Sequence, residues 1–399
     1  MATLRTAWKY FFRSFRAIAH SFRDLAVLLL PERASSEYAY AFIVHPRDIR
    51  DVYRQYPFLR AIPPFLIKLV LRFYWPVIIS RVSGLASAES GKEIRGFVLA
   101  VPLTAEQMLE DRPLARRKII QAARLAKKSG AKIIGLGGLT ASMSRGGLDV
   151  TENVKINVTT GHAYTAHNVS QNLFNLTERF GLSKQDVLVA VVGAAGSIGS
   201  STAQVIVREG YSRILLVEVE RKKEAVQKLL PILEGLNPDA NIAVSHSIEA
   251  IREADFIITA TNTPEALVRP EHLKPGAVVI DDAQPSDVAP EVLTRQDVLV
   301  VEAGVVHTPE IRTHFDFNLK GKNDTFCCMA ELLILAAHGW NDHYTIARTD
   351  LERVDTIASW GRALNFRPAA FQNFLESISE ERLERVSGIA RRVPTEVLR

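Results

Sequence analysis

The sequence has few cysteines, and this scarcity limits the kinds of protein it encodes. Its 399 residues include only two, the adjacent pair Cys327 and Cys328. A disulfide scaffold and a CxxC site are therefore excluded, and the histidines show no HExxH or related spacing, so we predict no metal site. We expect a reducing, cytoplasmic location, and the 47% hydrophobic content suffices for a packed core.

The sequence also lacks an apolar run approaching the roughly 18 residues of a membrane-spanning helix. Two shorter stretches, residues 1–35 and 58–80, are basic and rich in aromatic residues. Their composition is typical of helices that lie in a membrane interface, so we predict peripheral membrane attachment. Docking of the same segments on the protein's own core or on a partner subunit is the alternative. Charges interrupt the apolar part of the first stretch and no cleavage site follows it, which excludes a signal peptide. Its basic residues are Arg5, Lys9, Arg13, Arg16 and Arg23.

The sequence has little net charge, with a formal value of +5 at pH 7 over the whole chain. No nucleic-acid recognition motif accompanies it, so we expect no nucleic-acid partner. The oligomeric state stays open at this point.

A glycine turn stands in the middle of the chain, in the stretch VAVVGAAGSIGSSTAQVIVREG. A buried strand, a G-x-x-G-x-x-G turn and a helix start together favour a pyrophosphate, because the first helical amides have no partner within the helix. Strand-like runs continue to about residue 303, so we predict a Rossmann domain over residues 186–320. Tight helix-on-strand packing is the alternative role of these glycines. The expected cofactor contacts are Gly193, Ala194, Ala195, Gly196, Ser197, Ile198, Gly199, Glu218, Arg221, Lys222 and Thr261.

The choice between NAD and NADP stays open. Glu218 follows the second strand and would accept from a ribose hydroxyl, which favours NAD. Arg221 and Lys222 come soon afterwards and could bind the phosphate of NADP.

A second α/β region precedes the Rossmann domain, over residues 36–185, and we expect it to hold the substrate. Two segments place glycines and hydroxyls where the chain reverses, LGGLTAS and VTTGHAYTAHN. Helix capping or an internal hydrogen bond is the alternative role of each polar residue in them. The candidate substrate contacts are Gly137, Gly138, Thr140, His162, Tyr164 and Thr165.

The C-terminal region, residues 321–399, is predicted to be helical and to carry the reactive thiol. Asn323, Asp324 or Thr325 would cap a helix that runs from the cysteines to Ala337. A thiol in the first turn lies at the positive end of the helix dipole, which favours the nucleophilic thiolate. The alternative is that both cysteines are small buried hydrophobes.

The segments GLGGLTAS, VTTGHAYTAH, VAVVGAAGSIGS, VEAGVVHTP and FCCMAELLILAAHGW occur in this order. The combination resembles the cyanobacterial long-chain fatty acyl-[acyl-carrier-protein] reductases over roughly residues 40–368. The resemblance implies a Rossmann domain for NADPH and a fatty acyl thioester on Cys328, from which hydride transfer releases an aldehyde. The chain departs from the family at His162, where an asparagine is usual, and at VEVERKK, which replaces a basic strand end.

The predicted fold class is therefore α/β, with a doubly wound parallel sheet, a second α/β domain and a basic amphipathic N-terminal segment. The predicted function is reduction of an acyl thioester of acyl carrier protein or coenzyme A by NADPH, with NADH as the other possibility. Both carriers are anionic and suit the basic residues 112–128. Whether an aldehyde-consuming partner enzyme exists stays open. A small-carbonyl dehydrogenase of the amino-acid or shikimate type and a non-catalytic, membrane-associated nucleotide-binding protein are the alternatives.

Overall fold

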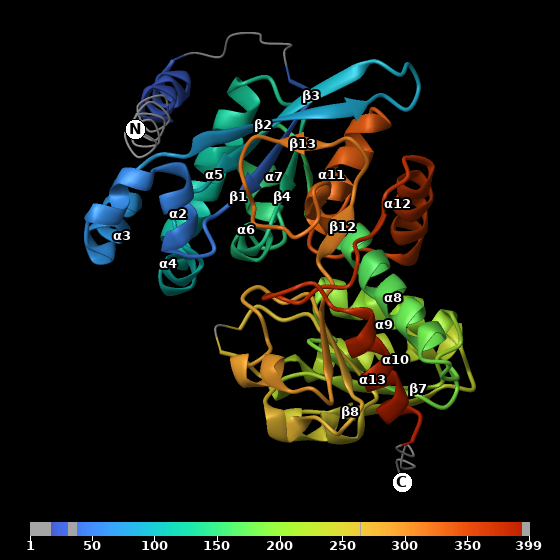
Figure 1. Cartoon of the computed structure of the whole chain (residues 1–399). Coiled ribbons are helices and arrows are strands. Elements are labelled where there is room, and N and C mark those ends of the chain that lie inside the picture. The colour runs from blue at the N-terminus through green and yellow to red at the C-terminus, as the bar shows by residue number, and fades with distance from the viewer. Residues whose placement is uncertain (1–16, 31–37, 264, 393–399) are drawn as a thin grey trace. The chain divides into compact units, whose positions relative to one another are not determined.

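The computed structural model describes residues 17–30, 38–263 and 265–392 (Figure 1). The chain forms two compact units. The first contains residues 1–161, 309–319 and 328–347, and the second contains residues 162–308, 320–327 and 348–399. The division at residue 161 differs from the predicted boundary at 185, and residues 321–399 are shared between the units instead of forming a region of their own.

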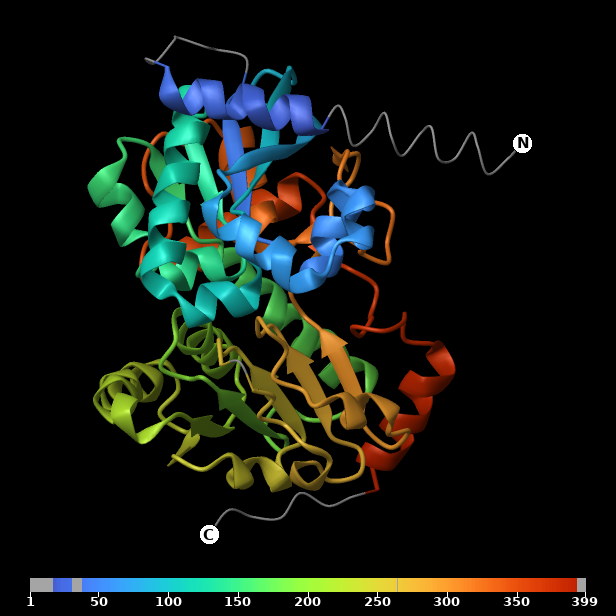
Figure 2. The ribbon, with the colours of Figure 1, turned by 90° about the vertical axis from the view of Figure 1, so that its left-hand side faces the viewer.

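The second unit is built on a six-stranded parallel sheet with the order β11-β10-β9-β6-β7-β8. The later strands of this sheet lie side by side in yellow to orange in Figure 2. Strand β6 is the first strand of this sheet along the chain. Strands β7 and β8 follow on one side of it, and β9, β10 and β11 then follow on its other side. This is the doubly wound order of dinucleotide-binding domains. The strands are β6 (Leu188–Val192), β7 (Arg213–Val217), β8 (Asn241–Ser245), β9 (Phe256–Thr259), β10 (Val278–Asp281) and β11 (Leu299–Glu302).

Both faces of this sheet are covered, so its central strands are apolar throughout. One face packs against α8 (His162–Arg179), α9 (Ser197–Arg208), α10 (Lys223–Leu236) and α13 (Glu380–Ala390). The other face packs against η3 (Ile248–Glu253), η4 (Pro270–His272) and η5 (Pro290–Thr294), whereas η2 (Glu220–Lys222) follows β7. All five residues of β6 are buried, as expected for a strand that lies between two layers.

The first unit contains a mixed sheet with the order β13-β2-β3-β1-β4-β5. Strands β3, β1, β4 and β5 run parallel, whereas β2 is antiparallel to β3 and β13 is antiparallel to β2. The strands are β1 (Tyr40–Val44), β2 (Val77–Ala86), β3 (Glu93–Ala100), β4 (Ile133–Leu136), β5 (Asn157–Thr159) and β13 (Arg312–Thr313).

Helices of the first unit cover this sheet and extend beyond it. One face of the sheet packs against α5 (Arg112–Lys128), α6 (Leu139–Met143) and α7 (Leu148–Asn153). Helix α4 (Ala105–Glu110) packs in the same apolar cluster as α5 and α6, whereas α2 (Ile49–Gln55), η1 (Pro57–Ala61) and α3 (Pro64–Phe73) form a separate cluster. Helix α3 ends at Phe73 and residues 77–80 are a strand, so the prediction of helix over the whole of residues 58–80 is wrong.

The N-terminal amphipathic segment falls partly outside the described residues. Arg5, Lys9, Arg13 and Arg16 lie there, whereas residues 17–29 are helical. Ser21 Oγ lies 2.7 Å from Tyr74 Oη, and Trp75 donates to the Ser21 carbonyl. One side of residues 17–29 thus docks on the first unit, as one of the two sequence interpretations expected.

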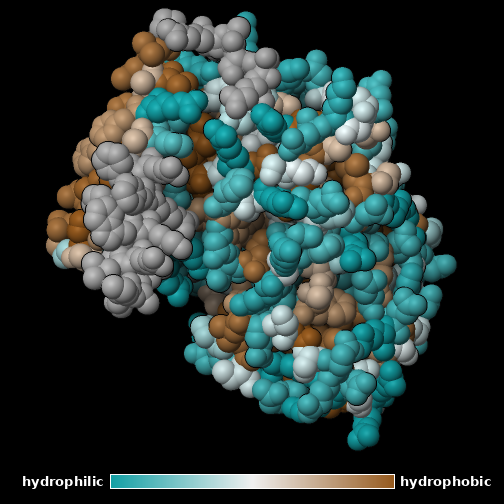
Figure 3. All heavy atoms as spheres, turned by 45° about the horizontal axis from the view of Figure 1, so that its top comes forward, coloured by the Kyte–Doolittle hydropathy of each residue, from teal (hydrophilic) through white to brown (hydrophobic). Residues whose placement is uncertain are grey.

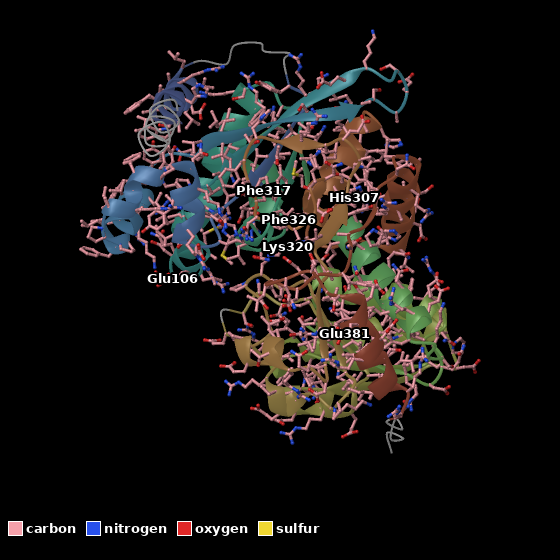
Figure 4. All side chains as sticks on the ribbon, in the orientation of Figure 1. Glu106, His307, Phe317, Lys320, Phe326 and Glu381 are labelled. Carbon is pink, nitrogen blue, oxygen red and sulfur yellow. The ribbon has the colours of Figure 1, made fainter. Side chains whose placement is uncertain are left out.

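A small antiparallel sheet introduces the cysteine helix. Its strands are β14 (Asp324–Phe326), β12 (Val305–His307) and β15 (Arg367–Pro368), and β14 leads directly into α11 (Cys327–Ala337). His307 of β12 and Phe326 of β14 are labelled in Figure 4, and His307 Nδ1 lies 3.2 Å from the Asp324 carboxylate. The segment predicted to cap the helix is therefore a strand. Helix α12 (Leu351–Ala363) follows later in the chain.

Candidate functional site

The glycine turn connects β6 to α9 in a conformation that depends on its glycines. Gly193 has φ +84°, and a Cβ there would lie 2.7 Å from the Ala260 carbonyl oxygen. A Cβ on Gly199 would lie 2.3 Å from the Gly193 carbonyl oxygen. Helix α9 thus starts in backbone contact with the turn, which is the close approach that a bound pyrophosphate requires.

The start of α9 has the features of an anion site. Its N-cap is Gly196, and no side chain caps the first turn. Ser197 Oγ is buried and has no hydrogen-bond partner among the residues that the structure describes. The turn therefore offers backbone amides, the positive end of the helix dipole and an unpaired hydroxyl, a set that fits a dinucleotide phosphate. Ala194 and Ala195 are buried in the turn, and Ile198 lies on the first turn of the helix.

Glu218 lies at the end of β7, where an adenosine ribose would be recognised. Its carboxylate accepts from the Ala195 amide at 3.0 Å and pairs with Lys222 at 3.4 Å. Arg221 is exposed on the short helix that follows. The acid that favours NAD is thus already paired with one of the two cations that favour NADP.

Thr261 is a predicted cofactor contact, but its hydroxyl already donates a hydrogen bond within the protein. It donates to the Asp287 carboxylate at 2.6 Å. Burial is the main cause that raises the pKa of Asp287 to about 7, while the Thr261 hydrogen bond lowers it. The hydroxyl proton of Thr261 therefore serves a buried acid at the carboxyl edge of the sheet.

The LGGLTAS segment of the first unit consists of a glycine turn and the start of α6, and hydrogen bonds and close packing hold it in place. Thr140 Oγ1 donates to the Gly137 carbonyl at 2.8 Å, and Gly138 has φ +55°. A Cβ on Gly137 would lie 2.4 Å from the ring of Phe42. The Thr140 hydroxyl thus has the internal role that the sequence interpretation gave as the alternative to substrate binding.

His45 is a buried residue of this loop region that sequence reasoning missed. Its Nε2 accepts from the Leu139 amide at 3.1 Å, and its Nδ1 lies 2.9 Å from the Pro46 carbonyl. These partners fix a neutral ring with the proton on Nδ1. Burial lowers the pKa of His45, which agrees with the neutral form.

His162, Tyr164 and Thr165 all lie at the start of α8, in the second unit, whereas Gly137, Gly138 and Thr140 lie in the first. Tyr164 and Thr165 are buried. Burial lowers the pKa of His162 to about 4, so its ring is neutral at pH 7. Its Nδ1 is buried without a hydrogen-bond partner among the described residues.

The two cysteines have different surroundings although they are neighbours on α11. Cys327 is buried, its amide donates to the Gly304 carbonyl at 2.9 Å, and its thiol lies 3.7 Å from the Ala303 carbonyl. Cys328 is partly exposed. Only Cys328 combines the first turn of the helix with access for a reactant, so it is the candidate nucleophile.

Gly161, from the VTTGHAYTAH segment, lies directly against Cys328. A Cβ on Gly161 would lie 2.3 Å from Cys328 Cα and 2.4 Å from Cys328 Cβ. Gly161 has φ +79°. The glycine therefore lets the backbone turn and lets the cysteine helix approach at this point.

A buried acid lies one turn further along α11. Glu331 accepts from the hydroxyls of Thr159 and Thr345, the latter at 2.8 Å, and Thr345 Oγ1 also accepts from the Thr160 amide at 3.0 Å. This network joins β5 and the segment after α11 to the helix that carries Cys328. Sequence reasoning missed Glu331, although its place in CCMAE, three residues after Cys328, put it on the same face of the helix.

Comparisons with known proteins give matches over most of the chain. The sequence profile of shikimate/quinate 5-dehydrogenase matches residues 176–303. The long-chain acyl-[acyl-carrier-protein] reductase of Synechococcus elongatus is 25% identical over 317 residues, which cover 74% of this chain and 88% of that enzyme. The aminotransferase PigE of a Serratia species is 24% identical over 301 residues, also 74% of this chain. This chain covers only 35% of PigE.

The second unit has the doubly wound strand order of dinucleotide-binding domains. Together with the glycine turn, the profile match supports a nicotinamide cofactor for the second unit. The protein is a distant relative of the cyanobacterial reductase. Among solved structures, quinate dehydrogenase of Corynebacterium glutamicum in complex with NAD is similar with a TM-score of 0.35 and 11% identity, covering 81% of this chain and 99% of that one. In the described part of the chain, no helix has the length and apolar character needed to span a bilayer.

Proposed function

We propose that this protein reduces a long-chain fatty acyl thioester to the aldehyde through a covalent intermediate on Cys328. The observation that carries the proposal is the difference between the two cysteines. Cys327 is buried beside a carbonyl, whereas Cys328 is partly exposed in the first turn of α11. A thiol at that end of a helix is favoured as the thiolate, the form that attacks a carbonyl carbon.

In the proposed first step, Cys328 Sγ bonds to the acyl carbonyl carbon and the bond from that carbon to the carrier sulfur breaks. The carrier leaves as a thiolate and takes up a proton. When bound, the reduced nicotinamide supplies the hydride that the acyl carbon needs to reach the aldehyde level. Release of the aldehyde breaks the bond to Cys328 and returns its thiolate. The overall reaction consumes one proton, one reduced cofactor and one thioester.

The chain's own residues orient this chemistry. Gly161 lies against the backbone of Cys328, and Glu331 ties the next turn of α11 to Thr159 and Thr345. These contacts fix the helix that carries the thiolate, and a fixed nucleophile needs little reorganisation to react. Glu331 is a positioning residue in this scheme, since its carboxylate is committed to the two threonine hydroxyls. In the second unit, the first turn of α9 with Ser197 and the acid Glu218 would hold the cofactor.

The acyl carrier is proposed to meet α5. This helix contains no acidic side chain, and Arg112, Arg117 and Arg124 are exposed on it. Acyl carrier proteins are acidic and coenzyme A is anionic, so both complement this surface. Raising the ionic strength should raise KM for the protein-bound substrate more than for the coenzyme A thioester, because more charge pairs are screened.

The test combines product and adduct detection. Purified protein is mixed with palmitoyl thioesters of acyl carrier protein and of coenzyme A, each with NADPH or NADH, and hexadecanal and the acylated peptide are measured by mass spectrometry. We expect aldehyde and an acyl group on Cys328. Cys328→Ala should abolish both while cofactor binding is retained, and Cys327→Ala is the matched control that should keep the adduct. Undiminished turnover by Cys328→Ala would rule out the covalent route.

A dehydrogenase acting on a small carbonyl is the second candidate, because the shikimate/quinate profile matches residues 176–303. It predicts oxidation of shikimate or quinate with NAD or NADP, at a rate that Cys328→Ala leaves unchanged. The same set of variants therefore separates the two functions.

A further inference from the structure

Helix α3 has an apolar face on each side, and within the described part of the chain only one of them is packed. Ile67 and Leu71 are buried against a small cluster with Val52. On the remaining surface, Phe65, Leu66, Leu69, Val70 and Phe73 are between 41% and 80% exposed. We call these five residues the α3 surface. A surface helix of a water-soluble domain normally presents polar residues on its outer side, so this face is built to be covered.

The helical residues 17–29 adjoin the end of α3. The ring of Phe22 lies 5.5 Å from that of Trp75, and Trp75 stacks on Tyr74, the C-cap of α3. Phe22 and Leu29 are themselves exposed. Figure 3 shows hydrophobic side chains, in brown, gathered along this margin of the first unit. Tyrosine and tryptophan at the edge of an exposed apolar face are typical of surfaces that meet a membrane interface.

The sequence segment that carries the α3 surface has charges of one sign. Residues 52–88 contain Arg54, Arg60, Lys68, Arg72 and Arg81 and no acidic residue. Lys68 pairs with Glu106, labelled in Figure 4, and Arg72 pairs with Asp111 at 2.5 Å, so these two cations are balanced from neighbouring elements. Arg60 is exposed on the turn before α3, and Arg23 is exposed on the helical residues 17–29.

We propose that the α3 surface, with Phe22 beside it, docks on a lipid bilayer that contains anionic phospholipids. The apolar side chains enter the acyl region, while Arg60 and Arg23 contact the phosphate head groups. Since no described helix is long enough to cross a membrane, α3 lies along the bilayer surface. The α3 surface includes neither Cys328 nor any residue of the glycine turn, so the inference stands whether or not the proposed reaction is correct.

The test is flotation of the full-length protein with vesicles of phosphatidylethanolamine and phosphatidylglycerol. Flotation separates vesicle-bound protein from aggregates, which sediment. The test variant carries Phe65→Gln, Leu69→Gln and Phe73→Gln. Because these side chains are exposed, circular dichroism and cofactor binding should be unchanged. The N-terminal segment is unchanged in this variant. We expect at least about a tenfold loss of vesicle-bound protein, because three large apolar side chains no longer enter the bilayer.

The matched control replaces three exposed hydrophobic residues of the second unit, Ile232, Val244 and Leu375, by glutamine. It should float like the wild type. Failure of the wild type to float, or flotation of the α3 variant equal to that of the wild type, would overturn the proposal. A wild-type dimer that the α3 variant converts to a monomer, with no flotation of either, would show that a second copy covers the surface and would also overturn it.

The preference for anionic lipid is tested separately. Arg60→Glu combined with Arg23→Glu should weaken binding to vesicles with phosphatidylglycerol, and added salt should weaken wild-type binding in the same way. If the wild type binds equally to phosphatidylcholine alone, the anionic part of the proposal is wrong.

Discussion

At the scale of single residues, a contact that leaves no room for substitution joins Gly161 to Cys328. The two backbones approach so closely that a methyl group on Gly161 would overlap Cys328 Cα and Cβ. Neither neighbour is the end of a flexible side chain, so one of the two segments must move. This gives the position of the candidate nucleophile a direct test.

Gly161→Ala should lower the free energy of unfolding and reduce alkylation of Cys328. Gly210→Ala is the matched control, because Gly210 also has a positive φ, +93°, but nothing lies within 4 Å of its Cβ position. The control should cost about 1–2 kcal/mol from backbone strain alone. The Gly161 variant should cost about 1–3 kcal/mol more from the clash. If urea unfolding gave both variants the same loss in free energy of unfolding, the close approach of Gly161 to Cys328 would not contribute to stability.

Two half-buried histidines, His162 and His167, give a pH dependence with a definite sign. Burial lowers the pKa of His162 and of His167 from 6.5 to about 4. Between these pH values the unfolded chain binds more protons than the native one, so their contribution to stability is full above pH 6.5 and is lost as the pH falls towards 4. Asp24 and Asp287 act in the opposite direction, because burial raises their pKa values to about 6 and about 7.

Substitution isolates the histidine contribution from that of the acids. His167→Gln should flatten the fall of stability between pH 6.5 and 4 relative to the wild type, as measured by urea unfolding at a series of pH values. The acids are present in both proteins and cancel in the difference. A difference between variant and wild type that does not change with pH would contradict the neutral state of His167 in the folded protein.

At the scale of elements, the junction of β6 and α9 is the proposed site for the phosphates of the cofactor. In Gly199→Ala the new methyl group would meet the Gly193 carbonyl oxygen and push α9 away from the turn. We expect at least about a tenfold weaker Kd for NADPH, because the amides of the first turn no longer converge on the phosphate.

Gly388→Ala is the control for this change, since Gly388 lies within α13 and nothing is within 4 Å of its Cβ position. It should stabilise the protein by up to about 1 kcal/mol through helix propensity and leave the Kd for NADPH unchanged. A Gly199 variant that binds NADPH as tightly as this control would mean that α9 does not form the phosphate site.

Elements with strong local patterns could be predicted from the sequence. The helix predicted to start at the glycine turn is α9, and the cysteine helix ends at Ala337 as expected. The predicted α/β fold with a doubly wound sheet is confirmed. In each case the periodicity of the hydrophobic residues and the positions of the glycines in the sequence agree with the tertiary structure.

Elements that depend on distant partners could not be predicted in this way. Asp324 is in a position that suits a helix cap, but it pairs as a strand with His307, which lies 17 residues earlier in the chain. Residues 77–80 continue an apolar helical pattern, yet they pair with β3. The site has the same limit, since Glu331 is satisfied by Thr159, 172 residues away in the sequence. No local pattern encodes such pairings.

At the scale of the whole molecule, the chain passes between the two units after residues 161, 308, 319, 327 and 347. The first unit is therefore incomplete without late segments. Leu332 of α11 packs on β4 at the Gly135 position, and Ala347 donates to the Gly146 carbonyl at 2.8 Å.

A fragment containing only residues 1–161 should consequently not fold. We expect no cooperative thermal transition and rapid cleavage by protease, because one face of its sheet has no cover. A chain in which residues 309–347 follow residue 161 through a flexible linker should recover a cooperative transition. A cooperative transition of the short fragment would show that α11 is dispensable for this unit.

The same interleaving has a consequence during protein synthesis. When residue 161 leaves the ribosome, the segments that complete its unit have not yet been translated. At about 5–20 residues per second, residue 347 follows roughly 10–40 s later. During this interval the nascent sheet of the first unit exposes the apolar face that α11 will cover, and the same nascent unit also carries the exposed α3 surface. We therefore expect chaperones that bind nascent chains to contact this protein during its synthesis, which ribosome-bound chains stalled after residue 161 would test by crosslinking.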